Sequence, residues 1–193
     1  MNQIQNLIDI NENPFVLFNK WYLEAKKKEI NDPNAMTLST ISDQMLPSSR
    51  VVLLKSYDLE GFVFYTNINS RKGLAIKKNK YVALNFHWKS LFKQIRIEGV
   101  AKKISKKDAD KYFISRPLKS RIGAWASNQS SILKNRKELE DKIKFYNMKF
   151  KRKIIPRPTF WTGFKVDPNL IEFWQDMPFR LHDRVEFNKI RNK

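Results

Sequence analysis

Cysteine is absent from the sequence, and histidine occurs only at His87 and His182. A chain without cysteine has no disulfide framework, no thiolate nucleophile and no cysteine-based zinc or iron–sulfur site. Two histidines are also too few for a histidine-rich metal centre. Redox chemistry on this chain would therefore require a bound organic cofactor.

Long apolar runs are missing as well. No stretch approaches the roughly 18 consecutive apolar residues that a membrane span needs, and residues 1–13 lack a basic segment followed by an apolar one. We therefore expect a cytoplasmic protein with no membrane partner. The 193 residues are 41% hydrophobic and 13% aromatic, which is enough for one buried core, and we predict a single domain over residues 1–193.

Acidic residues are scarce: the sequence has 19 Asp and Glu but 38 Lys and Arg, which gives a formal charge of +19. Such a balance is typical of nucleic-acid-binding proteins. However, 27 of the cations are lysines, many in short runs such as residues 26–28, 77–78 and 102–103. Charge runs usually solvate a surface, so we favour a biased surface and expect no specific nucleic-acid partner. A nucleic-acid-binding protein remains the alternative.

The pattern of apolar residues predicts an α+β protein. Helical spacing begins at Pro14 and continues over about residues 14–29, and further helices are predicted over 70–76, from Ser105 to just before Pro117, and over about 134–150. Strand patterns cover residues 36–41, 50–57, 62–66, 81–88, 93–104, 160–166, 171–175 and 181–187, with a turn at 167–169. Short connections between consecutive strands favour an antiparallel barrel with peripheral helices.

Three segments carry cations that could bind anionic ligands. In the strand 50–55, Arg50 and Lys55 would face opposite sides, so one strand could serve two anionic ligands. The strand that ends near Thr66 leads to Arg71 and Lys72 at a helix start, where a phosphate could bind. Tyr112 and Arg116 would share a helix face, with Ser120 just beyond. Solvated strand ends, a capped surface helix and a dipole-compensating arginine are the plain alternatives.

A fourth segment is harder to explain by packing. In a strand, Arg180, His182 and Arg184 would point to one face, and three cationic or titratable groups in a row do not suit a core. A lone histidine is more often structural. Between two arginines it indicates a site for an anion or an electron-rich ring.

Taken together, these segments resemble the pyridoxamine/pyridoxine 5′-phosphate oxidase family in order and spacing. The resemblance runs from about Asp32 to Arg184 and is carried by residues 50–55, 64–72, 112–120, 122–125, 129–131, 160–164, 171–175 and 180–184. It implies an FMN-binding split β-barrel, antiparallel and Greek-key-like with peripheral helices, that forms a homodimer with FMN at the subunit interface. It also implies an oxidase that makes pyridoxal 5′-phosphate from pyridoxamine or pyridoxine 5′-phosphate, with dioxygen as electron acceptor and hydrogen peroxide as product.

The resemblance also implies roles for individual residues. Contacts to FMN would come from Arg50, Val51, Val52, Leu53, Leu54, Lys55, Tyr65, Thr66, Arg71, Lys72, Gln94, Gln129, Ser130, Trp174 and Arg184. Substrate contacts would come from Lys55, Tyr112, Arg116 and Ser120 around the phosphate, and from Arg180 and His182, the implied catalytic pair, against the pyridine ring. A split-barrel flavoprotein with another substrate, or with a deazaflavin or haem ligand, is the nearest alternative because fold does not fix function.

Overall fold

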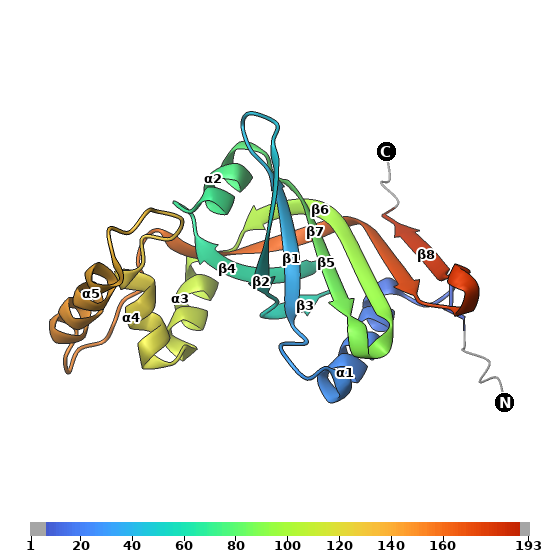
Figure 1. Ribbon diagram of the computed structural model, residues 1–193, viewed down its shortest axis with the longest axis horizontal. Coiled ribbons are helices and arrows are strands. Elements are labelled where there is room, and N and C mark those ends of the chain that lie inside the picture. Colours follow the sequence, from blue (N-terminus) through green and yellow to red (C-terminus); the bar gives the residue numbers. More distant parts are fainter. Residues whose placement is uncertain (1–6, 190–193) are drawn as a thin grey trace.

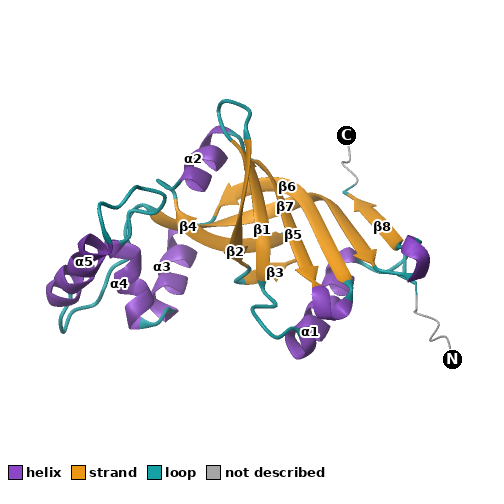
Figure 2. Cartoon of the chain, viewed as in Figure 1, coloured by secondary structure: helices purple, strands orange, loops and turns teal. Residues whose placement is uncertain are grey.

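The computed structural model describes residues 7–189. Its centre is an eight-stranded antiparallel sheet with the order β2-β1-β5-β6-β7-β4-β3, and β8 pairs with β7 beside that path (Figures 1 and 2). The strands are β1 (Ala35–Ile41), β2 (Pro47–Leu53), β3 (Ser56–Asp58), β4 (Gly61–Asn67), β5 (Tyr81–Trp88), β6 (Lys93–Lys103), β7 (Trp161–Gln175) and β8 (Asp183–Asn188). The sheet curls strongly, as the predicted α+β barrel architecture requires.

Helix α1 (Pro14–Lys28) closes the main core. Asn13 caps it by accepting a hydrogen bond from the Phe15 backbone N–H, and Pro14 stands in its first turn. Phe18 is fully buried, with ring centroids 4.8 Å from Phe62 and 5.4 Å from Phe86. The helix therefore covers the apolar face of the sheet with aromatic side chains.

Three helices gather at the opposite end of the molecule from α1 and β8 (Figure 1). They are α3 (Lys106–Ser115), α4 (Leu118–Ala126) and α5 (Arg136–Lys149), while the short α2 (Arg71–Lys78) follows β4. A second apolar cluster, formed by Phe113, Ile122, Ile155 and Trp161, joins this group to the start of β7. The two cores leave room between them for a cleft.

Two strand predictions were wrong. The predicted turn at residues 167–169 is absent, because β7 runs through it and absorbs Asn169 as a bulge opposite Glu98 and Gly99. A Cβ at Gly99 would lie 2.2 Å from the Asp167 carbonyl oxygen, so only glycine allows this close pairing. The predicted strand 50–57 is instead split, since β2 ends at Leu53 and β3 begins at Ser56.

The break between β2 and β3 marks a change of partner. The Leu54 N–H donates to the Asn34 carbonyl, whereas the Lys55 N–H donates to the Val63 carbonyl of β4. The alternation that placed Arg50 and Lys55 on opposite faces therefore does not extend to Lys55. Helix α4 was not predicted; it begins directly after Pro117, which ended the preceding helix as expected.

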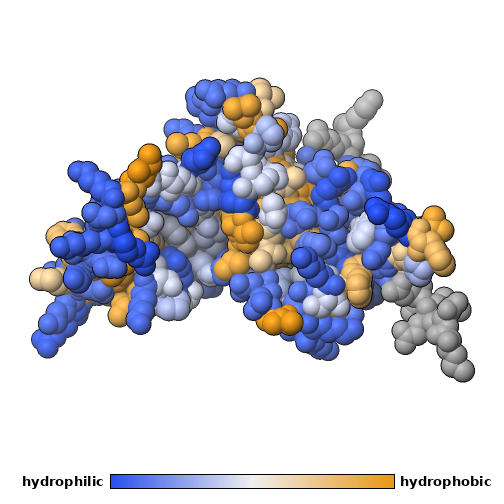
Figure 3. All heavy atoms as spheres, viewed as in Figure 1, coloured by the Kyte–Doolittle hydropathy of each residue, from blue (hydrophilic) through white to orange (hydrophobic). Residues whose placement is uncertain are grey.

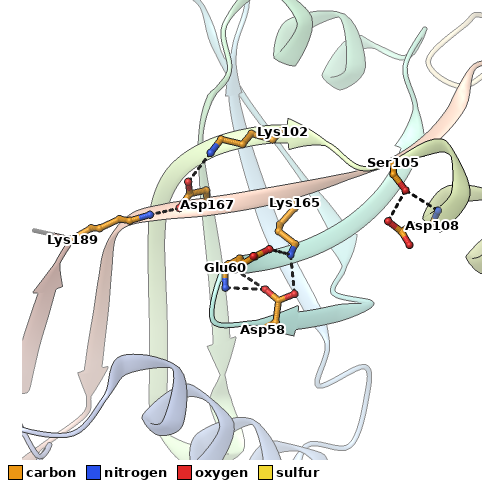
Figure 4. A network of polar contacts seen from close by, with 9 residues as sticks. Asp58, Glu60, Lys102, Ser105, Asp108, Lys165, Asp167 and Lys189 are labelled. Atoms are coloured by element: carbon orange, nitrogen blue, oxygen red, sulfur yellow. Dashed lines mark hydrogen bonds and ion pairs between the residues drawn. The ribbon is translucent and has the colours of Figure 1, made fainter. Parts of the chain in front are cut away.

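Ion pairs tie β7 to its neighbours on the outside of the sheet (Figure 4). Lys165 contacts Asp58 at 2.8 Å and Glu60 at 2.7 Å, and thereby fastens the β3–β4 hairpin. Asp167 forms ion pairs with Lys102 at 2.8 Å and with Lys189 at 2.7 Å. Exposed pairs of this kind contribute little singly and more as a network.

The surface matches the composition. In the view of Figure 3 it is mainly hydrophilic, with apolar groups scattered between charged ones. None of the helices within residues 7–189 is both long and apolar enough to cross a membrane.

Candidate functional site

A cleft of about 660 Å³ opens where β2, β4, α3 and α4 approach one another. Many of its lining residues are contacts predicted from the sequence, namely Val51, Val52, Leu53, Lys55, Tyr65, Thr66, Lys72, Tyr112, Arg116, Ser120 and Gln129. These residues come from five separate segments of the chain. The fold therefore assembles them into one concave site.

One wall of the cleft is the start of helix α2. Ser70 caps the helix by accepting a hydrogen bond from the Gly73 N–H, and the Lys72 ammonium lies 3.5 Å from the Ser70 hydroxyl. Lys72 is only 8% exposed. Burial, together with the positive charge of Arg50, lowers the pKa of Lys72 below its ordinary value.

Arg50 lies behind this wall and does not line the cleft. Its guanidinium donates to the Leu38 carbonyl and to the Thr40 and Ser48 hydroxyls at 2.8–3.0 Å. Burial and the nearby charge of Arg71 lower its pKa, although a guanidinium remains charged. Three cations thus lie near one another, and a bound anion would relieve their mutual repulsion.

The opposite wall of the cleft is aromatic. The Tyr65 ring packs against both Tyr112 and Trp161, with centroid distances of 4.0 and 5.0 Å, and the Tyr112 and Trp161 centroids are 6.2 Å apart. Burial, reinforced by Tyr112 and Asp108, raises the pKa of Tyr65 to about 12, so its phenol stays protonated at neutral pH. These rings form a rigid wall that ends in hydroxyl groups.

Arg116 completes this wall. Helix α3 ends at Ser115, so Arg116 follows the helix instead of sharing its face with Tyr112, yet both residues line the cleft. The Arg116 guanidinium lies 4.7 Å from the Trp161 ring centroid, and its Nη1 is buried without a hydrogen-bond partner. Burial lowers the Arg116 pKa. A buried donor without a partner is costly, and an anion in the cleft would satisfy it.

The remaining candidates around the cleft contribute in different ways. Gln129 accepts a hydrogen bond from the Thr66 hydroxyl at 3.1 Å, and Ser130 beside it has a positive φ of 68°. Leu54 is 3% exposed and belongs to the main core. Arg71 is exposed at the first position of α2.

A second group of candidates lies at the far end of the sheet, on the outer face of β6, β7 and β8. Register places Gln94 and Arg184 on either side of Trp174. The His182 ring lies 4.6 Å from the Trp174 ring, and its Nδ1 is 2.8 Å from Asp176 Oδ1. None of these residues lines the cleft, and neither does Arg180.

The prediction that Arg180, His182 and Arg184 alternate along one strand was wrong. Strand β8 begins only at Asp183, because Pro178 starts a short 3-10 turn that ends at Arg180. Arg180 has a positive φ of 61° and is exposed. The turn, not strand alternation, sets the direction of these side chains.

Several residues of the two groups were not predicted from the sequence. Asn67 and Trp161 line the cleft but were assigned no role, although each stands in a marked segment. Glu172 and Asp176 lie beside the second group, where they contact Arg184 and His182. A polar residue inside an apolar strand was the available signal for Glu172.

The comparisons with known proteins agree with this architecture. A solved structure of a pyridoxamine 5′-phosphate oxidase-related, FMN-binding protein from Nostoc punctiforme PCC 73102 shares the fold, with a TM-score of 0.67 at 12% identity over 93% of this chain and all of that chain. PhzG from Burkholderia lata 383, solved in complex with tetrahydrophenazine-1-carboxylic acid, gives a TM-score of 0.90 at 27% identity over 99% of this chain and 96% of that chain. The chain thus has the split-barrel fold.

Sequence relatives narrow the class further. The family model described as pyridoxamine 5′-phosphate oxidase matches residues 23–149, and the pyridoxine 5′-phosphate oxidase C-terminal dimerisation region matches residues 161–193. The pyridoxine/pyridoxamine 5′-phosphate oxidase of Bartonella quintana is 54% identical over 92% of this chain and 86% of its own length, and one from Ralstonia nicotianae is 51% identical over 92% and 84%. The chain belongs to the pyridoxamine 5′-phosphate oxidase family.

Proposed function

We propose that this protein is an FMN-dependent oxidase that converts pyridoxamine or pyridoxine 5′-phosphate to pyridoxal 5′-phosphate, with dioxygen as electron acceptor and hydrogen peroxide as product. The observation that carries the proposal is the pair of desolvated cationic walls, one at Lys72 and one at Arg116, in a single cleft. Two phosphate-bearing molecules that meet in one site need two such walls. The family relationship supports FMN and the phosphorylated substrate as these two molecules.

The residues at the α2 wall fit the phosphate of FMN. Lys72 is a buried cation that hydrogen-bonds to the Ser70 hydroxyl, and the capped start of α2 adds backbone N–H groups. Contacts to the rest of the cofactor are assigned to Arg50, Val51, Val52, Leu53, Leu54, Lys55, Tyr65, Thr66, Arg71, Gln129 and Ser130. When bound, FMN would supply the redox chemistry, which this chain's own side chains cannot supply.

The Arg116 wall fits the phosphate of the substrate. Arg116 offers the buried, unpartnered Nη1, while Tyr112, Ser120 and Lys55 offer further donors at the same cleft. Arg180 and His182 are assigned to the pyridine ring. His182 Nδ1 lies 2.8 Å from Asp176 Oδ1 and accepts a hydrogen bond from the Met177 backbone N–H at 3.3 Å, so both contacts hold the ring at Nδ1 and Nε2 would face the substrate.

A homodimer unites the two groups of residues. Gln94, Trp174, Arg180, His182 and Arg184 do not line the cleft of their own chain, so a second copy would bring them to it. The match of residues 161–193 to a dimerisation region supports this arrangement, because β7 and β8 lie within it.

Flavin content and turnover test the proposal together. Purified protein should release FMN on denaturation and produce pyridoxal 5′-phosphate and hydrogen peroxide from pyridoxamine 5′-phosphate. Arg116→Ala should bind substrate weakly and Arg180→Ala should turn it over slowly, so both should be impaired at low substrate concentration. Mixing the two under subunit exchange should raise the activity measured there, since each mixed dimer would contain one intact site. Protein that binds FMN but never oxidises either substrate would refute the assigned activity, and failure of the mixture to regain activity would refute the shared site.

A second candidate is a split-barrel flavoprotein with another substrate. The structural likeness to PhzG, which was solved with a tetrahydrophenazine carboxylic acid, favours keeping it in view. A tricyclic carboxylic acid carries no phosphate, so such an enzyme would not need the Arg116 wall. Turnover of phosphorylated but not dephosphorylated pyridoxamine would decide for the oxidase. We expect no specific nucleic-acid binding, so weak binding to DNA should collapse steeply with salt.

A further inference from the structure

The outer face of β6, β7 and β8 contains a buried carboxylate that the proposed function does not use. Glu172 lies on β7, and its side chain is only 6% exposed. Its Oε2 accepts hydrogen bonds from Arg96 Nη2 at 3.1 Å and from Arg184 Nε at 2.6 Å. A carboxylate with so little access to water needs such partners, because an unpaired buried charge is strongly destabilising.

The contact to Arg184 is made through Nε and not through the end of the guanidinium. A guanidinium is a rigid plane with its donors in a fixed fork, so a short bond at Nε determines where both Nη groups point. The Arg184 side chain nevertheless remains 57% exposed. Its Nη2 is 3.9 Å from Glu186 Oε2, which is too far for a hydrogen bond. Glu172 thus fixes the base of the fork and leaves its outer end accessible.

Arg96 supports the carboxylate from the other side. Register places it directly opposite Glu172 on β6, and its Nε also lies 3.7 Å from Glu98. Glu172 would therefore keep a cationic partner even without Arg184. This arrangement is what a positioning residue requires, since the carboxylate is anchored independently of the group that it directs.

We infer that Glu172 is a positioning residue that holds Arg184 in the orientation needed to contact the flavin. This inference rests on the proposed function, in which Arg184 is a cofactor contact, and it adds a residue that makes no contact itself. The alternative is that Glu172 only balances charge within the sheet. In that case its loss would alter stability without acting through Arg184.

A double-mutant cycle on FMN affinity separates the two roles. Flavin-free full-length protein would be titrated with FMN, with flavin fluorescence as the readout, for wild type, Glu172→Gln, Arg184→Met and the double variant. Loss of a hydrogen bond to a charged group corresponds to about tenfold or more, so each single variant should bind FMN at least about tenfold more weakly. The double variant should bind no more weakly than Arg184→Met alone.

Glu186→Gln is the matched control, because it removes a carboxylate that lies near Arg184 without a close contact. Its FMN affinity should stay within about twofold of wild type. If Glu172→Gln fails to fold, Glu172→Asp keeps a carboxylate at this position but withdraws it by one methylene from both Arg96 and Arg184, and it should still weaken FMN binding.

The possible outcomes are distinct. Wild-type affinity in either Glu172 variant, while Arg184→Met binds weakly, would overturn the positioning role and leave the cofactor site standing. Losses that multiply in the double variant would equally overturn it, because Glu172 would then act separately from Arg184. Wild-type affinity in Arg184→Met would instead remove Arg184 from the proposed cofactor site, and this inference with it.

Discussion

Replacing Lys72 with methionine would test whether the cationic wall at α2 exists for an anionic ligand. Lys72 is 8% exposed, its ammonium lies 3.5 Å from the Ser70 hydroxyl, and Arg50 lowers its pKa in addition to burial. Methionine keeps most of the apolar stem and removes only the charge. We expect the flavin-free protein to be as stable as wild type or more stable, and to bind FMN poorly.

The expected magnitudes concern two quantities, the FMN affinity, which should fall, and the stability of the flavin-free protein, which should rise. A hydrogen bond to a charged group contributes about 1.5–3 kcal/mol, so loss of the contact to the FMN phosphate should weaken binding by about 10- to 150-fold. The pKa of Lys72 is lower in the folded than in the unfolded chain, so its protonation opposes folding below that pKa. The penalty applies wherever the folded chain keeps Lys72 protonated, and its removal should stabilise the flavin-free protein by up to about 1 kcal/mol.

The assay needs both quantities on the same variant. Fluorescence titration gives the FMN dissociation constant, and thermal unfolding without flavin gives the stability. Lys77→Met is the matched control, because Lys77 lies on the same helix but is exposed. If Lys72→Met melted several degrees lower while its FMN affinity matched that of wild type, Lys72 would be a structural cation and the reasoning would be refuted.

Four further substitutions have defined outcomes. Arg116→Ala should chiefly raise KM, because a phosphate contact is present in ground and transition states alike. Arg180→Ala should lower kcat on the order of a hundredfold, because the substrate ring would be misaligned. Steady-state kinetics checks both, and a wild-type kcat for Arg180→Ala contradicts its role. Gly61→Ala should destabilise the fold by about 2 kcal/mol or more, because φ is +144° and the new Cβ would lie 2.1 Å from the Val166 carbonyl oxygen; an unchanged melting temperature would contradict this. Asp167→Asn should lower the free energy of unfolding by up to about 1 kcal/mol at pH 7 but much less near pH 3, which denaturant titration at both pH values measures. Burial raises the Asp167 pKa, yet hydrogen bonds from lysines lower it overall. The stabilisation by Asp167 is therefore present above the unfolded pKa and disappears as pH falls through the folded pKa.

Most of the strands and helices could be predicted from local pattern. Strand β5 occupies the predicted residues 81–88, and α5 lies within the predicted 134–150, because alternation and caps are properties of neighbouring residues. Pro168 was mistaken for part of a turn because its tolerance in β7 depends on the bulge opposite Gly99. A bulge is created by the partner strand, so the sequence of β7 alone does not contain it.

The candidate site divides in the same way. Lys72 and Arg116 were marked from their own segments, and the fold brings both to one cleft. A role for Glu172 was not predicted, because that role depends on contacts with Arg96 and Arg184, which reach it from two different strands. Contacts across strands require the register, and a single segment does not reveal the register.

The cations of this chain differ in whether water or a neighbouring carboxylate compensates their charge. Lysines in the runs 26–28 and 77–78 are exposed, so water compensates their charge and their presence indicates no ligand. Arg157 is buried but has Asp110 as its partner at 2.7 Å, which explains it structurally. Lys72 and Arg116 are desolvated and, within residues 7–189, neither forms an ion pair with a carboxylate, while Arg116 leaves a donor unsatisfied. A net charge of +19 is therefore uninformative as a total, whereas two cations whose burial the chain itself does not compensate indicate where anions bind.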